Sequence, residues 1–351
     1  HQPDTTKLLP SLGSFQPSFL LAVPRVFEKV YNSAEQTAEA GGKGKIFHAG
    51  VDVAVAYSRA KQEGKVPLVL NLKHKLFDAL LYQKLRTAMG GNIRHAVSGG
   101  GPLGERLGHF FNGIGVTILE GYGLTETTAP ITVNTLDRIK IGTVGKPLPG
   151  NAVRIAADGE ILTKGICVMR GYRNRPELQD ETFTDGWFRT GDIGELDADG
   201  FLRITGRKKE IIVTASGKNV VPALLEDQIR ADALVSQCVV IGEGRSFIAA
   251  LVTLDPEALP GWLARHQMDQ NLSLDELSTH PKVLETVQAV IDKANTSVSK
   301  AEAIKSFRVV PADFTEETGH LTPSMKIKRA VVLKDYEAVI EGIYSAPKPT
   351  A

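Results

Sequence analysis

A carboxylate and a guanidinium lie close together in residues 186–213, and both could bind a nucleotide. Asp192 ends the segment Trp187-Phe188-Arg189-Thr190-Gly191-Asp192, in which glycine allows a tight turn. Its carboxylate can accept two hydrogen bonds from a vicinal diol. The following residues alternate around Asp-Ala-Asp-Gly, which predicts a β-hairpin that returns the chain to Arg207. The simpler alternative is a hairpin with a solvated acidic turn and a basic flank.

Two glycine turns earlier in the chain each follow a predicted strand. The first is Ser98-Gly99-Gly100-Gly101-Pro102-Leu103, and the second is Gly121-Tyr122-Gly123-Leu124-Thr125-Glu126. A strand, a glycine turn and a helix are typical of α/β architecture, and a bare backbone lets a flat ring approach closely. The alternative for the second turn is that Thr125 and Glu126 only cap a helix.

Taken together, these segments resemble the adenylate-forming superfamily. Its junction is similar to TGD, a short hairpin and GRKKEIIV, and its tyrosine-glycine-x-threonine-glutamate motif is similar to Tyr122 to Glu126. The longer stretches GRKKEIIVTASGKNVVP and VPRVFEKVY resemble its long-chain fatty-acyl-CoA synthetases. The resemblance implies ATP-dependent conversion of a fatty acid to an acyl-adenylate, followed by transfer of the acyl group to coenzyme A.

The resemblance also implies roles for individual residues. It assigns the ribose hydroxyls of ATP to Asp192 and Arg207, a phosphate contact to Thr125, and a share in holding Mg²⁺ to Glu126, whose hard oxygen suits that ion. It assigns a domain hinge to Lys209 and the coenzyme A side of the second step to Gly217 and Lys218. The remaining nucleotide contacts that we expect are Gly99, Gly100, Gly101, Pro102, Gly121, Tyr122, Gly123 and Leu124.

A basic loop near the end, Leu321 to Arg329, is similar to the superfamily's C-terminal lysine motif. Lys326 is the matching catalytic position, and the resemblance implies that it reaches the reacting carboxylate and the phosphate. The common family pattern has glycine before this lysine, whereas this chain has Met325. Without the resemblance, the cluster reads as a solvated basic loop.

These residues require two structural parts, which we predict as residues 1–206 and 207–351 with a hinge near 207–209. The first would be the later part of a large α/β AMP-binding domain, with a small β-barrel-like portion at about 139–205. The second would be a mobile α+β domain with a helix at 222–230, strands at 237–242 and 246–254, and a capping box at 273–276. The segments 47–59 and 73–89 have helical apolar spacing, with Leu76, Leu80, Leu81 and Leu85 on one side in the second. We expect both helices to face the core rather than to carry a lipid-binding stripe.

Composition excludes some classes of partner. Lys+Arg 41 against Asp+Glu 40 gives a formal net charge of +1, so no overall field attracts nucleic acid. Cys167 and Cys238 lie in apolar segments, which predicts burial of both and fits a cytoplasmic location. No run approaches the roughly 20 apolar residues of a membrane span, although peripheral membrane association stays open. Gly41 to Lys45 lacks the context of a phosphate loop and is expected to be a turn.

The resemblance covers only the later part of such an enzyme. No segment matches the superfamily's phosphate loop that ends in lysine, so we expect the missing N-terminal part to be a partner and this chain to be inactive alone. Two rival interpretations remain: an acyl-AMP ligase that loads a carrier protein, and a non-catalytic relative that binds a nucleotide or acyl group. Acyl chain length and oligomeric state are not predictable from these residues.

Overall fold

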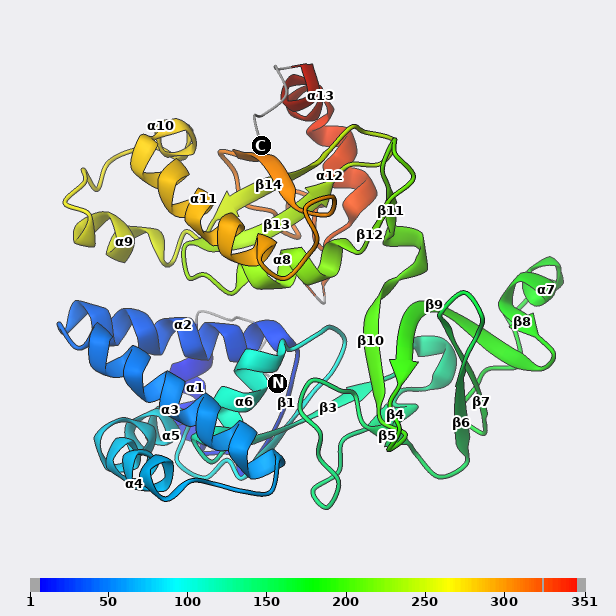
Figure 1. The fold of residues 1–351 in the computed structure, drawn as a ribbon, viewed down its shortest axis with the longest axis horizontal. Coiled ribbons are helices and arrows are strands. Elements are labelled where there is room, and N and C mark those ends of the chain that lie inside the picture. Colours follow the sequence, from blue (N-terminus) through cyan, green and yellow to red (C-terminus); the bar gives the residue numbers. More distant parts are fainter. Residues whose placement is uncertain (1–6, 324, 346–351) are drawn as a thin grey trace. The chain divides into compact units, whose positions relative to one another are not determined.

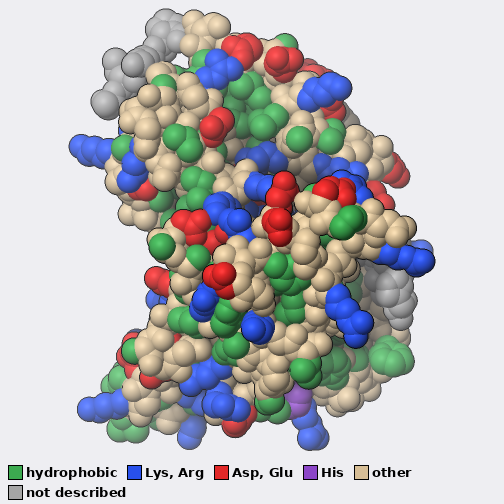
Figure 2. Space-filling model, turned by 90° about the vertical axis from the view of Figure 1, so that its right-hand side faces the viewer, with side chains coloured by type: hydrophobic (Ala, Val, Ile, Leu, Met, Phe, Trp, Pro, Cys, Tyr) green, Lys and Arg blue, Asp and Glu red, His purple; other side chains and the backbone are tan. Residues whose placement is uncertain are grey.

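The structure is a computed structural model that describes residues 7–323 and 325–345. The chain divides into two compact units between Ile204 and Thr205. Figure 1 shows the elements of each unit. On the face drawn in Figure 2, cationic and anionic side chains are interspersed, in keeping with a formal net charge of +1.

The first unit begins with helices that share one apolar core with the strands of a parallel sheet. Phe27, Phe47, Phe110 and Phe111 are buried in its core. Pro24 starts a helix at its first turn, where the missing N–H costs nothing. The elements up to the end of the third strand are α1 Leu8–Phe15, β1 Phe19–Ala22, α2 Pro24–Ala40, α3 Gly44–Gln62, α4 Leu68–Phe77, the π-helix η2 Asp78–Tyr82, α5 Gln83–Ala88, β2 His95–Ser98, α6 Glu105–Gly113 and β3 Thr117–Tyr122.

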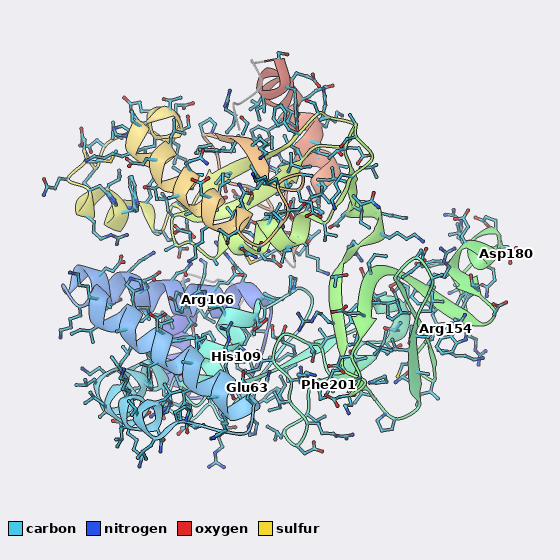
Figure 3. The ribbon with its side chains drawn as sticks, viewed as in Figure 1. Glu63, Arg106, His109, Arg154, Asp180 and Phe201 are labelled. Atoms are coloured by element: carbon cyan, nitrogen blue, oxygen red, sulfur yellow. The ribbon has the colours of Figure 1, made fainter. Side chains whose placement is uncertain are left out.

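Helix α6 is fixed in this core by polar contacts as well as apolar ones. Figure 3 labels two of its residues, Arg106 and His109. The Arg106 guanidinium lies 4.6 Å from the centre of the Tyr31 ring. His109 Nδ1 lies 2.9 Å from the hydroxyl oxygen of Ser58, and burial lowers the pKa of His109.

Short strands and turns make up the rest of the first unit, and the last strand crosses into the second unit. They are η3 Thr125–Thr127, β4 Thr132–Val133, β5 Lys146–Pro147, β6 Asn151–Ile155, β7 Glu160–Gly165, η4 Pro176–Leu178, α7 Gln179–Thr182, β8 Phe183–Thr184, β9 Trp187–Leu196 and β10 Leu202–Arg207. The predicted hairpin is confirmed as β9 and β10, and Phe201, labelled in Figure 3, follows its turn.

Two sheets organise these strands. The first has the order β1-β2-β3-β4-β5, with β1, β2 and β3 parallel and the last two pairings antiparallel. The second has the order β10-β9-β7-β6, with β8 beside β9. Among the described strands no pairing joins β6 to β10, so closure into a barrel stays a prediction.

The second unit is an α+β layer built on a three-stranded sheet. The order is β13-β14-β15, antiparallel and then parallel. Its two long strands are buried on both faces, which explains their nearly continuous apolar sequence. The elements are η5 Lys208–Glu210, β11 Ile212–Val213, β12 Asn219–Val220, α8 Pro222–Arg230, β13 Val235–Ile241, β14 Ile248–Leu254, α9 Leu259–Arg265, α10 Leu274–Thr279, α11 Pro281–Asn295, β15 Ile304–Val309, α12 Arg329–Asp335 and α13 Glu337–Ser345.

Several local predictions are confirmed in this unit. Helix α8 has the predicted bounds, with Leu225 and Ile229 buried. Ser273 and Glu276 form the predicted capping box, in which the serine oxygen accepts from the Glu276 backbone N–H. Both features were predictable because the residues that produce them lie within a few positions of one another in the sequence.

Two predictions of burial are wrong. Cys238 is fully buried, but Cys167 is only partly buried. The segment 73–89 is helical, yet Leu76 and Leu80 face solvent with exposed fractions of 58% and 52%. Within the described ranges, none of the helices combines the length and apolar character that crossing a bilayer demands.

Candidate active site

The two glycine turns meet at one edge of the first sheet. Strands β2 and β3 are parallel, with Ser98 opposite Glu120, so the residues that follow both strands share the carboxyl edge. A Cβ built on Gly99 would lie 3.9 Å from the carbonyl oxygen of Gly121. Carboxyl edges of parallel strands are the usual place for ligands in α/β sheets. The structure therefore brings the predicted nucleotide segments 99–102 and 121–124 together.

The fold requires glycine at some of these positions, through a positive φ or close packing, but not at others. Gly100 has a φ of +83°, which side chains rarely adopt. A Cβ on Gly123 would lie 2.8 Å from Ala129 Cα and 3.0 Å from Pro130 Cα, so packing excludes one. Gly99 and Gly101 have neither constraint, since the nearest atoms would be 3.9 Å and 3.7 Å away. Bare backbone at these last two positions is what an approaching ligand would require.

A buried hydrogen bond joins the second glycine turn to the predicted ribose carboxylate. The Tyr122 hydroxyl donates to Asp192 Oδ2 at 2.6 Å, and the two residues are 8% and 4% exposed. Asp192 sits on β9 just after Gly191, whose φ is +71°. The Asp192 backbone N–H donates to Thr190 Oγ1 at 3.1 Å. The carboxylate is therefore oriented by Tyr122 of β3, while Thr190 of β9 holds the backbone of the same residue.

Glu126 lies in the short helix η3 and is held by an unforeseen partner. The Tyr172 hydroxyl donates to Glu126 Oε1 at 2.7 Å, and this bond is the largest cause of the raised pKa of Tyr172. The Glu126 carbonyl accepts from the Met169 N–H at 2.7 Å. Thr125 precedes Glu126 in the same turn, and the Leu124 N–H donates to Thr127 Oγ1 at 2.9 Å. Tyr172 gave no signal in the sequence, because its contact depends on a loop far along the chain.

The donor set around Glu126 fits magnesium only in the presence of phosphate. No group of three or more potential ligands among histidine, cysteine and acidic residues occurs in the described part of the chain. Mg²⁺ usually binds through one or two carboxylates together with substrate phosphates and water. The single carboxylate of Glu126 meets that pattern when phosphates and water complete the ligand set.

A second unforeseen carboxyl group lies beside the glycine turns. Glu120 precedes Gly121 on β3, and burial raises the pKa of its carboxyl to about 7, with a smaller opposing effect from a hydrogen bond of the Leu103 backbone. An acidic residue within an apolar strand was the sequence feature that could have pointed to this buried carboxyl group. The backbone of Leu103, which ends the first glycine turn, forms a hydrogen bond with the Glu120 carboxyl group.

The lysine loop of the second unit is tightly folded. The Lys326 N–H donates to Thr322 Oγ1 at 3.0 Å, and the Lys326 carbonyl accepts from the Thr322 N–H at 2.8 Å. Leu321 and Ile327 pair as an isolated antiparallel bridge, and the Lys326 side chain is exposed. Met325 has a φ of +61°, a left-handed conformation that glycine adopts without cost. This explains why a glycine would suit the position, and it shows that methionine adopts the same backbone conformation.

The other predicted residues of the second unit lie near its start. Arg207 ends β10, and Lys209 lies in η5 immediately after it. Gly217 has a φ of +78° in the turn between β11 and β12, and a Cβ there would meet open space. Lys218 Nζ lies 3.3 Å from Glu302 Oε1. These positions are consistent with a hinge and an exposed loop, and their roles remain predictions.

Comparison with known proteins decides the family. Residues 1–173 match the AMP-binding enzymes, and residues 209–348 match the AMP-binding enzyme C-terminal domain. This chain belongs to the AMP-binding enzymes.

Relatives of this chain include long-chain-fatty-acid–CoA ligase FadD15 of Mycobacterium bovis, which is 54% identical over 342 residues. That match covers 97% of this chain and 57% of the relative, so the chain spans little more than half the length of the curated relative. A second relative, long chain acyl-CoA synthetase 5 of Arabidopsis thaliana, is 30% identical and is covered to 54%.

A solved structure supports the fold of this chain. The adenylation domain of a carboxylate reductase from Mycobacterium chelonae matches with a TM-score of 0.70 and 22% identity, covering 98% of this chain and 49% of that one. The α/β fold class that the sequence predicted is confirmed by this match.

Proposed function

We propose that this chain is the later part of an ATP-dependent ligase that activates a long-chain fatty acid and transfers it to coenzyme A. The observation that carries the proposal is the buried Tyr122–Asp192 hydrogen bond, which links the two motifs predicted to hold the nucleoside. It occurs in a chain that is 54% identical to a long-chain-fatty-acid–CoA ligase.

In the first step, a fatty-acid carboxylate oxygen attacks the α-phosphorus of ATP, and the bond to the pyrophosphate oxygen breaks. The carboxylate and the phosphate are both anionic, so cationic groups stabilise their approach where water is excluded. Lys326 supplies one point charge in this proposal. Glu126 would take part in holding Mg²⁺, which supplies further positive charge to the phosphates, and the hydroxyl of Thr125 would contact phosphate.

In the second step, the sulfur of coenzyme A attacks the acyl carbon, the acyl carbon–oxygen bond breaks, and AMP leaves. Lys326 and the incoming thiol would need the same carbonyl, so we propose that the second unit turns about Lys209 between the two steps. Movement about a few backbone torsions is an established way to assemble two sites in turn. Gly217 and Lys218 would then face coenzyme A.

The site residues divide the work of binding. Asp192, oriented by Tyr122, accepts hydrogen bonds from the ribose diol, and Arg207 contacts the same sugar. The open backbone at Gly99 and Gly101 leaves room for the adenine ring. We place the enzyme in the cytoplasm, and the free thiols of Cys167 and Cys238 fit that location.

The test is ATP–pyrophosphate exchange with palmitate, measured on this chain and on a version extended upstream. We expect exchange from the extended version only, because this chain has no segment that matches the phosphate loop. Lys326→Ala in the extended version should lower exchange by at least about a hundredfold, the scale typical of one electrostatic stabiliser. Exchange by this chain alone would contradict the expected inactivity.

The acceptor is tested separately with coenzyme A as the only thiol. Thioester formation supports the ligase, whereas exchange without thioester favours the ligase that loads a carrier protein. If the extended version binds AMP but exchanges with no fatty acid, the non-catalytic relative becomes the better interpretation.

A further inference from the structure

His320 is buried immediately before the lysine loop, and both nitrogens of its ring are held. Its Nε2 lies 3.0 Å from Asp335 Oδ2, and its Nδ1 lies 2.8 Å from Thr318 Oγ1. A carboxylate only accepts hydrogen bonds, so Nε2 is the donor in the bond to Asp335. His320 is 7% exposed, whereas the Asp335 side chain is 48% exposed. The ring is therefore fixed in one orientation by polar groups on two sides.

Aromatic side chains enclose the same imidazole ring. The Phe314 ring centre lies 5.2 Å from it in an edge-on arrangement, and the Tyr336 ring centre lies 5.9 Å away. Phe314 is buried in an apolar core of the second unit together with Val332 of α12. Leu321, the residue after His320, is buried in the same core. The chain that leads into the lysine loop is thus packed into the second unit.

His320 also holds the far end of the loop. Its carbonyl accepts from the Lys328 N–H at 2.7 Å, and the isolated antiparallel bridge continues this pairing into the loop. Lys326 lies two residues inside that bond. Met325 beside it has a φ of +61°, which a residue other than glycine adopts only at a cost. The ends of the loop must therefore be held for this turn to persist.

The helix that follows the loop has an anchor of its own at Arg329. The Arg329 guanidinium donates to the Val240 carbonyl at 2.7 Å and to Glu226 Oε1 at 2.5 Å. The same Glu226 oxygen accepts from the Val240 N–H at 2.7 Å. Arg329 and Asp335 are the first and last residues of α12. The bond from His320 to Asp335 therefore ties the loop to a helix that is itself fixed at its other end.

We propose that His320, through its bond to Asp335, is a positioning residue that holds the loop of Lys326 in its folded conformation. All of these contacts lie within the second unit, so they persist wherever that unit stands relative to the first. The consequence for catalysis rests on the proposed function, in which Lys326 neutralises charge during acyl-adenylate formation. A lysine whose loop is ordered only part of the time offers its charge in that fraction.

The first test measures amide hydrogen exchange at Lys326 and Lys328 in the 351-residue chain. Asp335→Ala removes the acceptor from an exposed position and leaves the core intact. We expect exchange at both amides to become roughly 2- to 12-fold faster, the effect of losing one hydrogen bond. Asp292→Ala is the matched control, because Asp292 also accepts a side-chain hydrogen bond on an exposed helix face of this unit, at 2.8 Å from Gln288 Nε2. It should change neither amide.

Two variants of His320 separate the bond from the buried ring. The amide nitrogen of glutamine can occupy the place of Nε2 and donate to Asp335, whereas alanine cannot. We expect His320→Gln to keep more of the amide protection than His320→Ala. Adding Asp335→Ala to His320→Ala should change the protection no further, because both substitutions remove the same interaction.

The second test uses the version extended upstream and compares the two half-reactions. Asp335→Ala should lower ATP–pyrophosphate exchange with palmitate by up to about tenfold, in step with the loosening of the loop. Thioester formation from added palmitoyl-adenylate and coenzyme A should stay unchanged, since Lys326 has left the carbonyl in that step of the proposed mechanism. General destabilisation would lower both half-reactions alike, so their ratio is the readout.

Two results would overturn the proposal. The first is unchanged amide exchange at Lys326 and Lys328 in Asp335→Ala, which would show that the bond does not hold the loop, whatever reaction the enzyme performs. The second is an equal fall of both half-reactions, which would make the bond a general stabiliser of the unit. If Lys326→Ala leaves pyrophosphate exchange unchanged while Asp335→Ala loosens the loop, the proposed role of the lysine fails and the anchoring by His320 is supported.

Discussion

Substitution of Gly99 or Gly101 by alanine should affect ligand binding without destabilising the fold. Neither residue has a left-handed φ, and the nearest atoms to an added Cβ are 3.9 Å and 3.7 Å away, which is ordinary van der Waals contact. Alanine also has a smaller unfolded-state entropy than glycine, so we expect Gly99→Ala and Gly101→Ala to be neutral or to stabilise by about 0.4–1 kcal/mol.

The same two substitutions should weaken the binding of AMP. An adenine ring resting on this backbone would lie at van der Waals distance, and a methyl group would occupy that space. Overpacking costs about 1–3 kcal/mol, which corresponds to a loss of affinity of roughly 5- to 150-fold. The assay is calorimetric titration with AMP, beside thermal unfolding of the same preparations.

Gly123→Ala provides the contrast. A Cβ there would lie 2.8 Å from the Ala129 backbone, so we expect a loss of stability of about 1–3 kcal/mol and a lower melting temperature. If Gly99→Ala and Gly101→Ala both bind AMP as tightly as the parent chain, the first glycine turn does not line the nucleotide. If a version extended upstream binds no AMP, the assignment of this edge of the sheet is wrong.

Three further predictions concern buried polar groups. Glu120→Gln should stabilise the protein at pH 8 by up to about 3 kcal/mol and have little effect at pH 4.5. The reason is that burial raises the pKa of the Glu120 carboxyl to about 7, so its ionisation above that pH opposes folding. Denaturant midpoints of both proteins across this pH range measure the difference in stability. His109 acts with the opposite sign: its lowered pKa means that stability is lost as pH falls below about 6.5, and His109→Gln should flatten that part of the same profile. Tyr122→Phe removes a buried hydrogen bond to Asp192 and should cost about 1.5–3 kcal/mol in the free energy of unfolding, so an unchanged denaturant midpoint would contradict this reasoning.

Much of the fold follows from local signals in the sequence. Apolar runs on two strands predicted β13 and β14, and a Ser-x-x-Glu pattern predicted the start of α10. Each signal is contained within a few residues, so no knowledge of the rest of the chain is needed. The glycine turns after β2 and β3 were readable for the same reason, and parallel pairing then places them side by side.

Other features depend on contacts between residues that are distant in the sequence. The bond between Tyr172 and Glu126 joins separate loops, and no spacing rule reports such a meeting. Leu76 and Leu80 have the spacing of a core-facing helix, yet they are exposed because Phe77 and Leu81 make the contact instead. Periodicity shows that a helix has an apolar side, but it does not show which element covers that side.

The distribution of the candidate residues between the two units has a mechanistic consequence. Tyr122 and Asp192, joined by a buried hydrogen bond, both belong to the first unit, whereas Lys326 belongs to the second. The carboxylate that we expect to orient the ribose is therefore fixed by the first unit alone, whereas Arg207 and the lysine that we expect to neutralise charge belong to the second. Movement of the second unit could then exchange catalytic groups while the carboxylate on the ribose keeps its orientation, as a ligase that forms an acyl-adenylate before the thioester requires.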